Sequence, residues 1–203
     1  MKQKILNSVI NNIKKNNPHI TEEKLEIISY GLESIYLTFT KIILIVVLSI
    51  ILNIFKETIL LLLFYNIIRL FAFGLHAKNS FACLITSLTI FIGGVYLSLY
   101  LNIDIKIKIA LSIISLILIA IYAPADTEKR PLINERKRKR FKILSIITSI
   151  IMTYFIITTK NNIMSNLMLT GYIAATIMIL PITYKIYGLP YNNYKRYHDE
   201  IDN

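Results

Sequence analysis

Long apolar runs constrain the fold of this chain more than any other feature of its sequence. They lie at positions 36–54, 58–73, 81–101, 109–125, 141–159 and 163–187. Crossing the hydrocarbon layer takes roughly 20 apolar residues in a helix, and these runs do not alternate as barrel strands do. The composition agrees, since 55% of the 203 residues are hydrophobic and 17% are charged. We therefore predict an all-α, polytopic membrane protein with about six transmembrane helices.

Two of these runs are irregular. The run at 58–73 is short and carries Asn66 and Arg69, so it either spans with local thinning of the bilayer or enters and turns back. The run at 163–187 contains Gly171 and Pro181, which membrane helices tolerate where neighbouring groups satisfy the freed backbone.

Basic residues predict the orientation, because positive charge accumulates in cytoplasmic loops. The segment after the fourth run is the most basic, with Lys129, Arg130, Arg136, Lys137, Arg138, Lys139, Arg140 and Lys142. If this loop, 126–140, is cytoplasmic, six spans place both termini in the cytoplasm. Four of the 23 basic residues then fall outside: Lys56, Lys106, Lys108 and Lys160. This pattern accounts for most of the net charge of +11 without a nucleic acid partner.

The first 35 residues are expected to form an amphipathic interfacial arm, because their apolar stretches are too short to span and no signal-peptide cleavage site follows. A helix rich in lysine ends near Asn16–Pro18, and Thr21 can cap a second helix. The arm either lies on anionic lipid or grips a substrate helix or a second subunit. A six-span bundle, 36–187, and a cytoplasmic tail, 188–203, complete the predicted organisation.

The segment from Arg69 to Cys83, RLFAFGLHAKNSFAC, concentrates the polar residues that have no evident structural purpose. It contains Gly74, His76 and the single cysteine of the chain, and it lies at the cytoplasmic junction of the second and third runs. Taken alone, this signal is modest, because a cysteine in a membrane helix is usually a small apolar residue. A histidine at a helix end is usually solvated or hydrogen-bonded.

The chemistry available to these residues is narrow. Cys83 and His76 would supply two metal ligands, whereas structural zinc takes four, so we predict no metal and no cofactor. The sequence has no HExxH, GxSxG or glycine-rich phosphate loop. A thiol nucleophile with a histidine base is the enzyme class that remains.

Such a pair places a demand on the backbone. Seven residues of straight helix separate two side chains by about 10.5 Å along the axis, whereas a base acts within about 3 Å. The intervening segment must therefore leave the helix, and Gly74, Asn79 and Ser80 are suitable breakers.

Two motifs carry a resemblance to a known family. The pattern RxxxxGxHxxxxxxC, formed by Arg69, Gly74, His76 and Cys83, is followed by YAPADTEKRPL at 122–132. Together with the length, the apolar runs and the basic loops, they resemble the accessory gene regulator protein B (AgrB) family, membrane cysteine endopeptidases of Gram-positive quorum sensing.

The resemblance implies that His76 and Cys83 are the catalytic pair and that activity also needs Arg69 and Gly74. The implied substrate is a small AgrD-like propeptide with an amphipathic leader and an acidic C-terminal segment. Cleavage near its C-terminus would leave a thioester on Cys83, and an internal cysteine or serine would close a thiolactone or lactone ring.

Supporting roles follow from position. Arg69 can stabilise a thiolate, bind a substrate carboxylate or snorkel to the headgroups. Pro124 should bend or end the fourth span, so either Asp126 or Glu128 can orient His76, or both only pair with nearby basic residues. The basic residues of the loop (Lys129, Arg130, Arg136, Lys137, Arg138, Lys139 and Arg140) either bind anionic lipid or attract the acidic part of the propeptide.

Two other kinds of protein fit the composition. A membrane transporter or peptide exporter would use Asn66 and Arg69 to line a path, and a membrane scaffold would need neither. A homodimer is a further expectation for an apolar bundle of this size, as is a Gram-positive cell membrane as its location.

Overall fold

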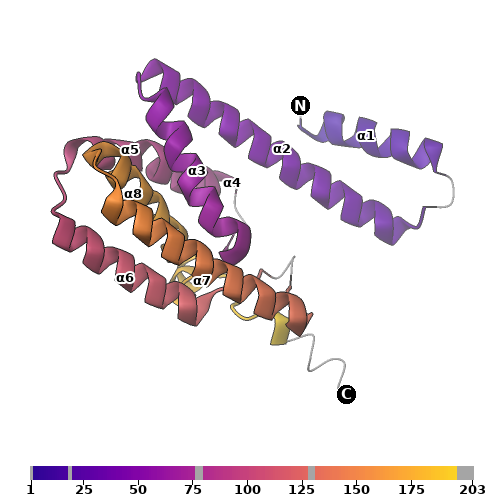
Figure 1. Ribbon diagram of the computed structural model, residues 1–203. Coiled ribbons are helices and arrows are strands. Elements are labelled where there is room, and N and C mark those ends of the chain that lie inside the picture. The colour runs from indigo at the N-terminus through magenta and orange to yellow at the C-terminus, as the bar shows by residue number, and fades with distance from the viewer. Residues whose placement is uncertain (1, 18–19, 76–79, 128–130, 196–203) are drawn as a thin grey trace. The chain divides into compact units, whose positions relative to one another are not determined.

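The computed structural model describes residues 2–17, 20–75, 80–127 and 131–195 (Figure 1). The chain divides into two compact units, Met1–Leu48 and Ser49–Asn203. The described residues are overwhelmingly helical and contain no β-strand beyond one isolated bridge. The prediction of an all-α fold is therefore confirmed.

The first unit contains helix α1 (Lys2–Asn16) and most of helix α2 (Glu22–Ile51). The predicted cap is present, since the side chain of Thr21 accepts a hydrogen bond from the N–H of Lys24 at 3.4 Å. Helix α2 runs without a break past residue 35, where we predicted that the arm ends and the first span begins. The arm and the first apolar run therefore share one helix.

The second unit contains the remaining helices. They are α3 (Phe55–Ala72), α4 (Ser80–Leu88), the π-helix η1 (Thr89–Gly93), α5 (Gly94–Tyr100), α6 (Ile105–Tyr122), α7 (Glu135–Thr158), α8 (Asn162–Ile177) and α9 (Pro181–Ile186). Helices α4, η1 and α5 follow one another directly, so the predicted run at 81–101 is one helical rod with a π turn in its middle.

Capping residues determine several helix starts. The side chains of Asp104, Asn134 and Asn161 accept backbone N–H groups at the starts of α6, α7 and α8. Because α7 already begins at Glu135, the basic run at 136–140 lies in its first turns and not in a loop. The last apolar run is two helices, because α8 ends at Ile177 and Pro181 opens α9.

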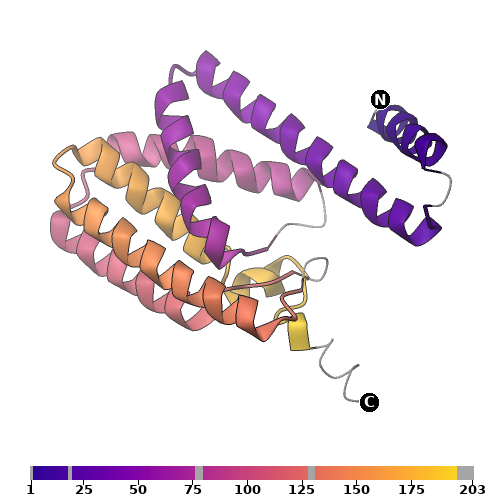
Figure 2. The ribbon, with the colours of Figure 1, turned by 45° about the vertical axis from the view of Figure 1, so that its right-hand side comes forward.

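Helix packing in the second unit centres on α8. It packs against α3, α5, α6 and α7, and α6 lies alongside α7 (Figures 1 and 2). Gly171 of α8 permits close approach, since a Cβ there would lie 3.1 Å from the backbone N of Tyr65 in α3. Small residues at helix contacts are typical of membrane bundles.

The distribution of polarity is that of a protein surrounded by lipid. On α7 the side chains of Ser145 and Ser149 are buried, whereas Ile147 and Ile151 are about half exposed. Small polar residues on the inside and large apolar ones on the outside invert the soluble pattern.

Three helical stretches are long and apolar enough to cross a membrane: Phe81–Tyr100, Ile105–Tyr122 and Glu135–Thr158. A shorter apolar helix covers Thr38–Ile51. These stretches correspond to four of the predicted runs and agree with a helical membrane protein. The total of six spans stays a prediction.

Candidate functional site

The candidate site begins where α3 ends. The helix stops at Ala72, and Phe73 follows with a positive φ of 58°. A bulky residue rarely adopts this conformation, and such outliers concentrate at functional sites because the surrounding structure must hold them. The ring of Phe73 packs edge-on against Phe141 of α7, with the ring centroids 4.9 Å apart. The chain therefore leaves α3 in a conformation that its neighbours enforce.

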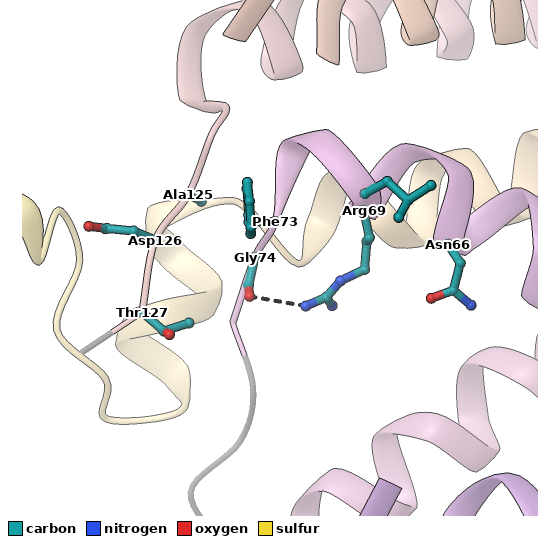
Figure 3. Close-up of a pocket in the computed structure, with 8 residues that line it drawn as sticks. Asn66, Arg69, Phe73, Gly74, Ala125, Asp126 and Thr127 are labelled. Atoms are coloured by element: carbon teal, nitrogen blue, oxygen red, sulfur yellow. Dashed lines mark hydrogen bonds between the residues drawn. The ribbon is translucent and has the colours of Figure 1, made fainter. Parts of the chain in front are cut away.

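Arg69, in the last turn of α3, holds the backbone that follows (Figure 3). Its Nη2 donates to the carbonyl oxygens of Gly74 and Leu75, each at 3.0 Å. Its Nη1 donates to the hydroxyl of Tyr65 at 2.5 Å, and the guanidinium carbon lies 5.3 Å from the centre of that ring. In this structure the half-buried arginine acts as a clamp on the residues before His76.

Gly74 is in a conformation that other residues rarely adopt. Its φ is +114°, and a Cβ on it would lie 2.9 Å from the carbonyl oxygen of Met178 and 3.2 Å from a methyl carbon of Ile179. Its N–H donates to the carbonyl of Ala125 at 2.9 Å. Both the backbone angle and the close approach therefore require glycine at this position.

The remaining main-chain groups of this segment are also bonded. The N–H of Leu75 donates to the carbonyl of Met178 at 3.1 Å, and the N–H of Ala125 donates to the carbonyl of Ala72 at 3.0 Å. Phe73 and Ala125 thus form a parallel β-bridge. All four main-chain polar atoms of Gly74 and Leu75 have partners. The segment before His76 is therefore held by hydrogen bonds to Arg69, Ala125 and Met178.

Asp126 is buried, with 4% of its surface exposed, and its carboxylate accepts main-chain N–H groups. The donors are Asn193 at 3.0 Å, Tyr194 at 2.8 Å and Leu132 at 3.3 Å. Figure 3 shows its side chain directed away from Arg69. In the described residues this carboxylate joins the loop after α6 to the C-terminal segment, by which we mean residues 178–195.

Tyr184 of α9 strengthens the same junction. Its hydroxyl donates to the carbonyl of Asp126 at 2.9 Å and lies 3.3 Å from that of Ala125. Its ring packs edge-on against Tyr191. Burial is the main reason that the pKa of Tyr191 rises to about 12, so this hydroxyl stays protonated and can donate to the carbonyl of Tyr122 at 3.4 Å.

A cleft of about 280 Å³ lies beside this irregular backbone (Figure 3). Its lining comes from the end of α3 and from the loop after α6: Asn66, Arg69, Leu70, Phe73, Gly74, Ala125, Asp126 and Thr127. Three predicted site residues, Arg69, Gly74 and Asp126, therefore border one cavity.

Cys83 occupies the fourth position of α4, which begins at Ser80, and its side chain is partly buried. Its carbonyl accepts the hydroxyl of Ser87 at 2.8 Å. Thr86, one turn further along, shares a hydrogen bond with the hydroxyl of Tyr187. The cysteine thus lies in the first turn of a new helix, close to a contact with the C-terminal segment.

Other predicted site residues lie outside the described residues: His76, Glu128, Lys129 and Arg130. The distance between His76 and Cys83, and the orienting role assigned to Asp126 or Glu128, therefore stay predictions. Because residues 76–79 lie outside the described part of the chain, the predicted break in the helix between His76 and Cys83 also stays a prediction.

The basic residues at the start of α7 differ in how far their side chains are exposed. Arg136, Lys137, Lys139 and Arg140 are exposed, whereas Arg138 is partly buried. The guanidinium carbon of Arg138 lies 3.2 Å from the centre of the Tyr194 ring. Arg138 therefore takes part in holding the C-terminal segment, and the other four are exposed.

The sequence reasoning missed the roles of Tyr65, Tyr184, Tyr187 and Asn193. The tail after residue 187 carries no recognised motif, and tyrosines near a membrane surface are common in any case. The sequence signal that could have indicated these roles is a group of three tyrosines, at 184, 187 and 191, beside Gly188 and Pro190.

The fold and this site define a helical membrane protein with an irregular backbone segment held by an arginine and, in the next described helix, a cysteine in the first turn. Comparison with known proteins makes the assignment specific. The family model for accessory gene regulator B matches residues 6–179, and the chain belongs to that family.

Individual proteins with the name of this family are similar to the chain over most of its length. A protein named as AgrB-like from Clostridium acetobutylicum is 36% identical over 190 residues, covering 92% of this chain and 90% of its own length. Another from Listeria innocua is 32% identical over 172 residues, covering 84% and 83%. The accessory gene regulator protein B of Staphylococcus epidermidis is 34% identical over 169 residues, covering 83% and 84%. No solved structure matches the chain. Family membership supports a role in the agr quorum-sensing system.

Proposed function

We propose that this protein is a membrane cysteine endopeptidase that cleaves a quorum-sensing propeptide near its C-terminus. Cys83 is the nucleophile and His76 the base. The observation that carries the proposal is the end of α3 at Ala72, followed by irregular backbone at Phe73–Leu75 directly before His76, with Cys83 in the next described helix, α4. A straight helix would keep the pair about 10.5 Å apart.

The position of Cys83 supports its role as a nucleophile. A thiolate attacks, and the first turn of a helix favours negative charge because its N–H groups lack partners within the helix. Cys83 lies in the first turn of α4. Arg69 and Gly74 support His76 from the other side, since they fix the backbone up to Leu75, the residue directly before it.

The reaction balances in two steps. In the first, His76 takes the proton of Cys83, the sulfur attacks the scissile carbonyl, and the proton passes to the departing amine of the C-terminal fragment. In the second, an internal cysteine or serine of the propeptide attacks the thioester and closes the ring, which releases Cys83. The second step depends on the effective concentration of that internal group exceeding the competition from water.

The propeptide partner is proposed to carry an acidic C-terminal segment that binds the exposed basic residues at the start of α7. Arg136, Lys137, Lys139 and Arg140 are all exposed there. Clustered positive charge raises the local concentration of an acidic peptide and is weakened by salt. Lys129 and Arg130 belong to the same proposal through their place in the sequence, and anionic lipid is the alternative ligand for all six.

Topology belongs to the proposal as well. A multi-pass arrangement with both termini in the cytoplasm places the end of α3, the start of α4 and the start of α7 on the cytoplasmic side, where the propeptide is made. The excess of basic residues at the start of α7 supports this orientation.

The decisive experiment combines this chain with a candidate propeptide in one membrane. Cys83→Ala and His76→Ala should each abolish cleavage while the protein remains in the membrane at the parent level. His198→Ala is the matched control and should cleave like the parent. Full cleavage by Cys83→Ala would refute the peptidase and favour an exporter or a scaffold.

A further inference from the structure

The C-terminal segment contacts the backbone directly before His76 and also the helix that contains Cys83. On one side the carbonyl of Met178 accepts the N–H of Leu75, the residue before His76. On the other side the hydroxyl of Tyr187 bonds to that of Thr86, three residues after Cys83 and in the same helix. The ten residues from Met178 to Tyr187 thus connect the segment before His76 to the helix of Cys83.

A second connection passes through the loop after α6. Tyr184 donates its hydroxyl to the carbonyl of Asp126, and Ala125 bonds in turn to Gly74. The Asp126 carboxylate binds the main-chain N–H groups of Asn193 and Tyr194 further along the C-terminal segment. The backbone before His76 is therefore attached to this segment directly and through one intermediate loop.

We propose that residues 178–194 form a brace that positions His76 against Cys83, with Tyr184, Tyr187 and Asp126 as its positioning residues. None of the three reacts with substrate. They act by fixing the irregular backbone at Phe73–Leu75 and the first turns of α4 in one arrangement. This inference rests on the proposed function and assigns a purpose to the end of the last apolar run, 163–187, and to the start of the predicted tail.

The kinds of bond involved support a positioning role. Two of the brace contacts end on non-helical backbone, at Leu75 and Asp126, and the third ends on Thr86 in the helix of Cys83. Phe73 has a positive φ of 58°, and a bulky residue keeps such a conformation only where the surroundings impose it. Loosening the brace should therefore move the catalytic groups before it unfolds the bundle.

Two full-length variants test the brace. Tyr184→Phe and Tyr187→Phe each remove one hydroxyl group and keep the ring, so packing is retained. Tyr154→Phe is the control, since that side chain is 61% exposed on α7. At saturating propeptide each brace variant should cleave about 10- to 100-fold more slowly, because small displacements of reacting groups have effects of this size. The KM should not change.

A second readout distinguishes positioning from simple destabilisation. A thiol reagent is used to alkylate Cys83 in the parent and in each Phe variant, with and without His76→Ala. In the parent, loss of His76 should slow alkylation. In the Tyr187→Phe background the same loss should have little further effect, because the pair is already separated. A purely structural residue would leave the effect of His76 undiminished.

Asp126→Asn provides an independent variant, with Asp104→Asn as its control because that exposed side chain caps α6. An amide nitrogen in place of either carboxylate oxygen would face an N–H donor, so at least one brace contact is lost. The expected result is again a lower rate of cleavage at unchanged KM.

The outcomes separate the two proposals. If cleavage depends on Cys83 and His76 but the Phe and Asn variants behave like their controls, the brace is overturned and the peptidase stands. A raised KM at an unchanged maximal rate also overturns the brace. A parent chain that does not cleave refutes the proposed function, on which the brace depends.

Discussion

The two ends of the helix bundle in the second unit use polar residues in different ways. At the end formed by the starts of α6 and α8, Lys108 donates to Asn162 at 2.7 Å and to Ser165 at 3.0 Å. Asn166 donates to the carbonyl of Leu101 at 2.8 Å. Each of these side chains belongs to a regular helix, and they join helices to one another.

At the other end, the polar side chains bind irregular backbone. Arg69 holds the carbonyls of Gly74 and Leu75, and Asp126 holds N–H groups of the C-terminal segment. Phe73 and Gly74 have positive φ there. The comparison teaches that buried polar residues alone do not mark a functional site in this protein. The candidate site differs in that its polar residues hold non-helical backbone.

The largest expected effect is that of Gly74→Ala. The added methyl group would meet the carbonyl of Met178 at 2.9 Å on a backbone with φ of +114°. We expect cleavage to fall by about 100-fold or more, because the backbone before His76 must move. Gly93→Ala is the matched control, since nothing lies within 4 Å of the Cβ position there. Equal cleavage by the two alanine variants would contradict the requirement for glycine.

Arg69→Lys should have the next largest effect. Lysine retains the charge but lacks the planar fork that reaches the two carbonyls and the Tyr65 hydroxyl together. A fall in the maximal rate of about 10- to 100-fold is expected from the loosened backbone. If Arg69 mainly bound a substrate carboxylate, the lysine variant would retain the maximal rate and raise the KM.

Charge reversal on α7 should have a smaller, salt-dependent effect. Replacing Arg136 and Lys137 by glutamate should raise the KM for an acidic propeptide by roughly tenfold at low ionic strength, and less at high ionic strength. Cleavage is measured across a salt series. Glu135→Gln serves as a nearby control. A KM that is independent of both charge and salt would remove the steering proposal.

Asn166→Ala should have no effect on cleavage per folded molecule. It removes the donor to the carbonyls of Ser98 and Leu101, and a buried unpaired carbonyl costs about 1–3 kcal/mol of stability. Thermal unfolding in detergent measures that loss. A selective loss of cleavage at unchanged stability would break the distinction between the two ends of the bundle.

Much of the fold could be predicted because it depends on local chemistry. Thr21 caps α2, Pro124 follows the end of α6 at Tyr122, and the apolar runs coincide with helices. Gly74 was expected to break helical structure, and α3 ends two residues before it. The split at Pro181 was not predicted, because prolines are tolerated inside many membrane helices and only the neighbours decide.

The partners of the site residues could not be predicted, because they are distant in sequence. Two of the three N–H groups that the Asp126 carboxylate binds in the described residues belong to Asn193 and Tyr194, 67 and 68 residues further along. Lys108 was expected at an outer loop, yet it is buried against Asn162 and Ser165. Neither set of contacts could be predicted from the residues that neighbour Asp126 or Lys108 in the sequence.

The π turn at Thr89–Gly93 lets α4 and α5 remain in phase although the chain carries one residue more than a regular helix would need there. A π turn holds one residue more than an α turn, and both complete one rotation about the axis. Deleting a single residue within this turn should therefore let α4 and α5 continue as one regular α-helix and leave Cys83 on the same face. Deleting a residue between Cys83 and the turn should instead rotate the sulfur by about 100° relative to α5, which is packed against α8.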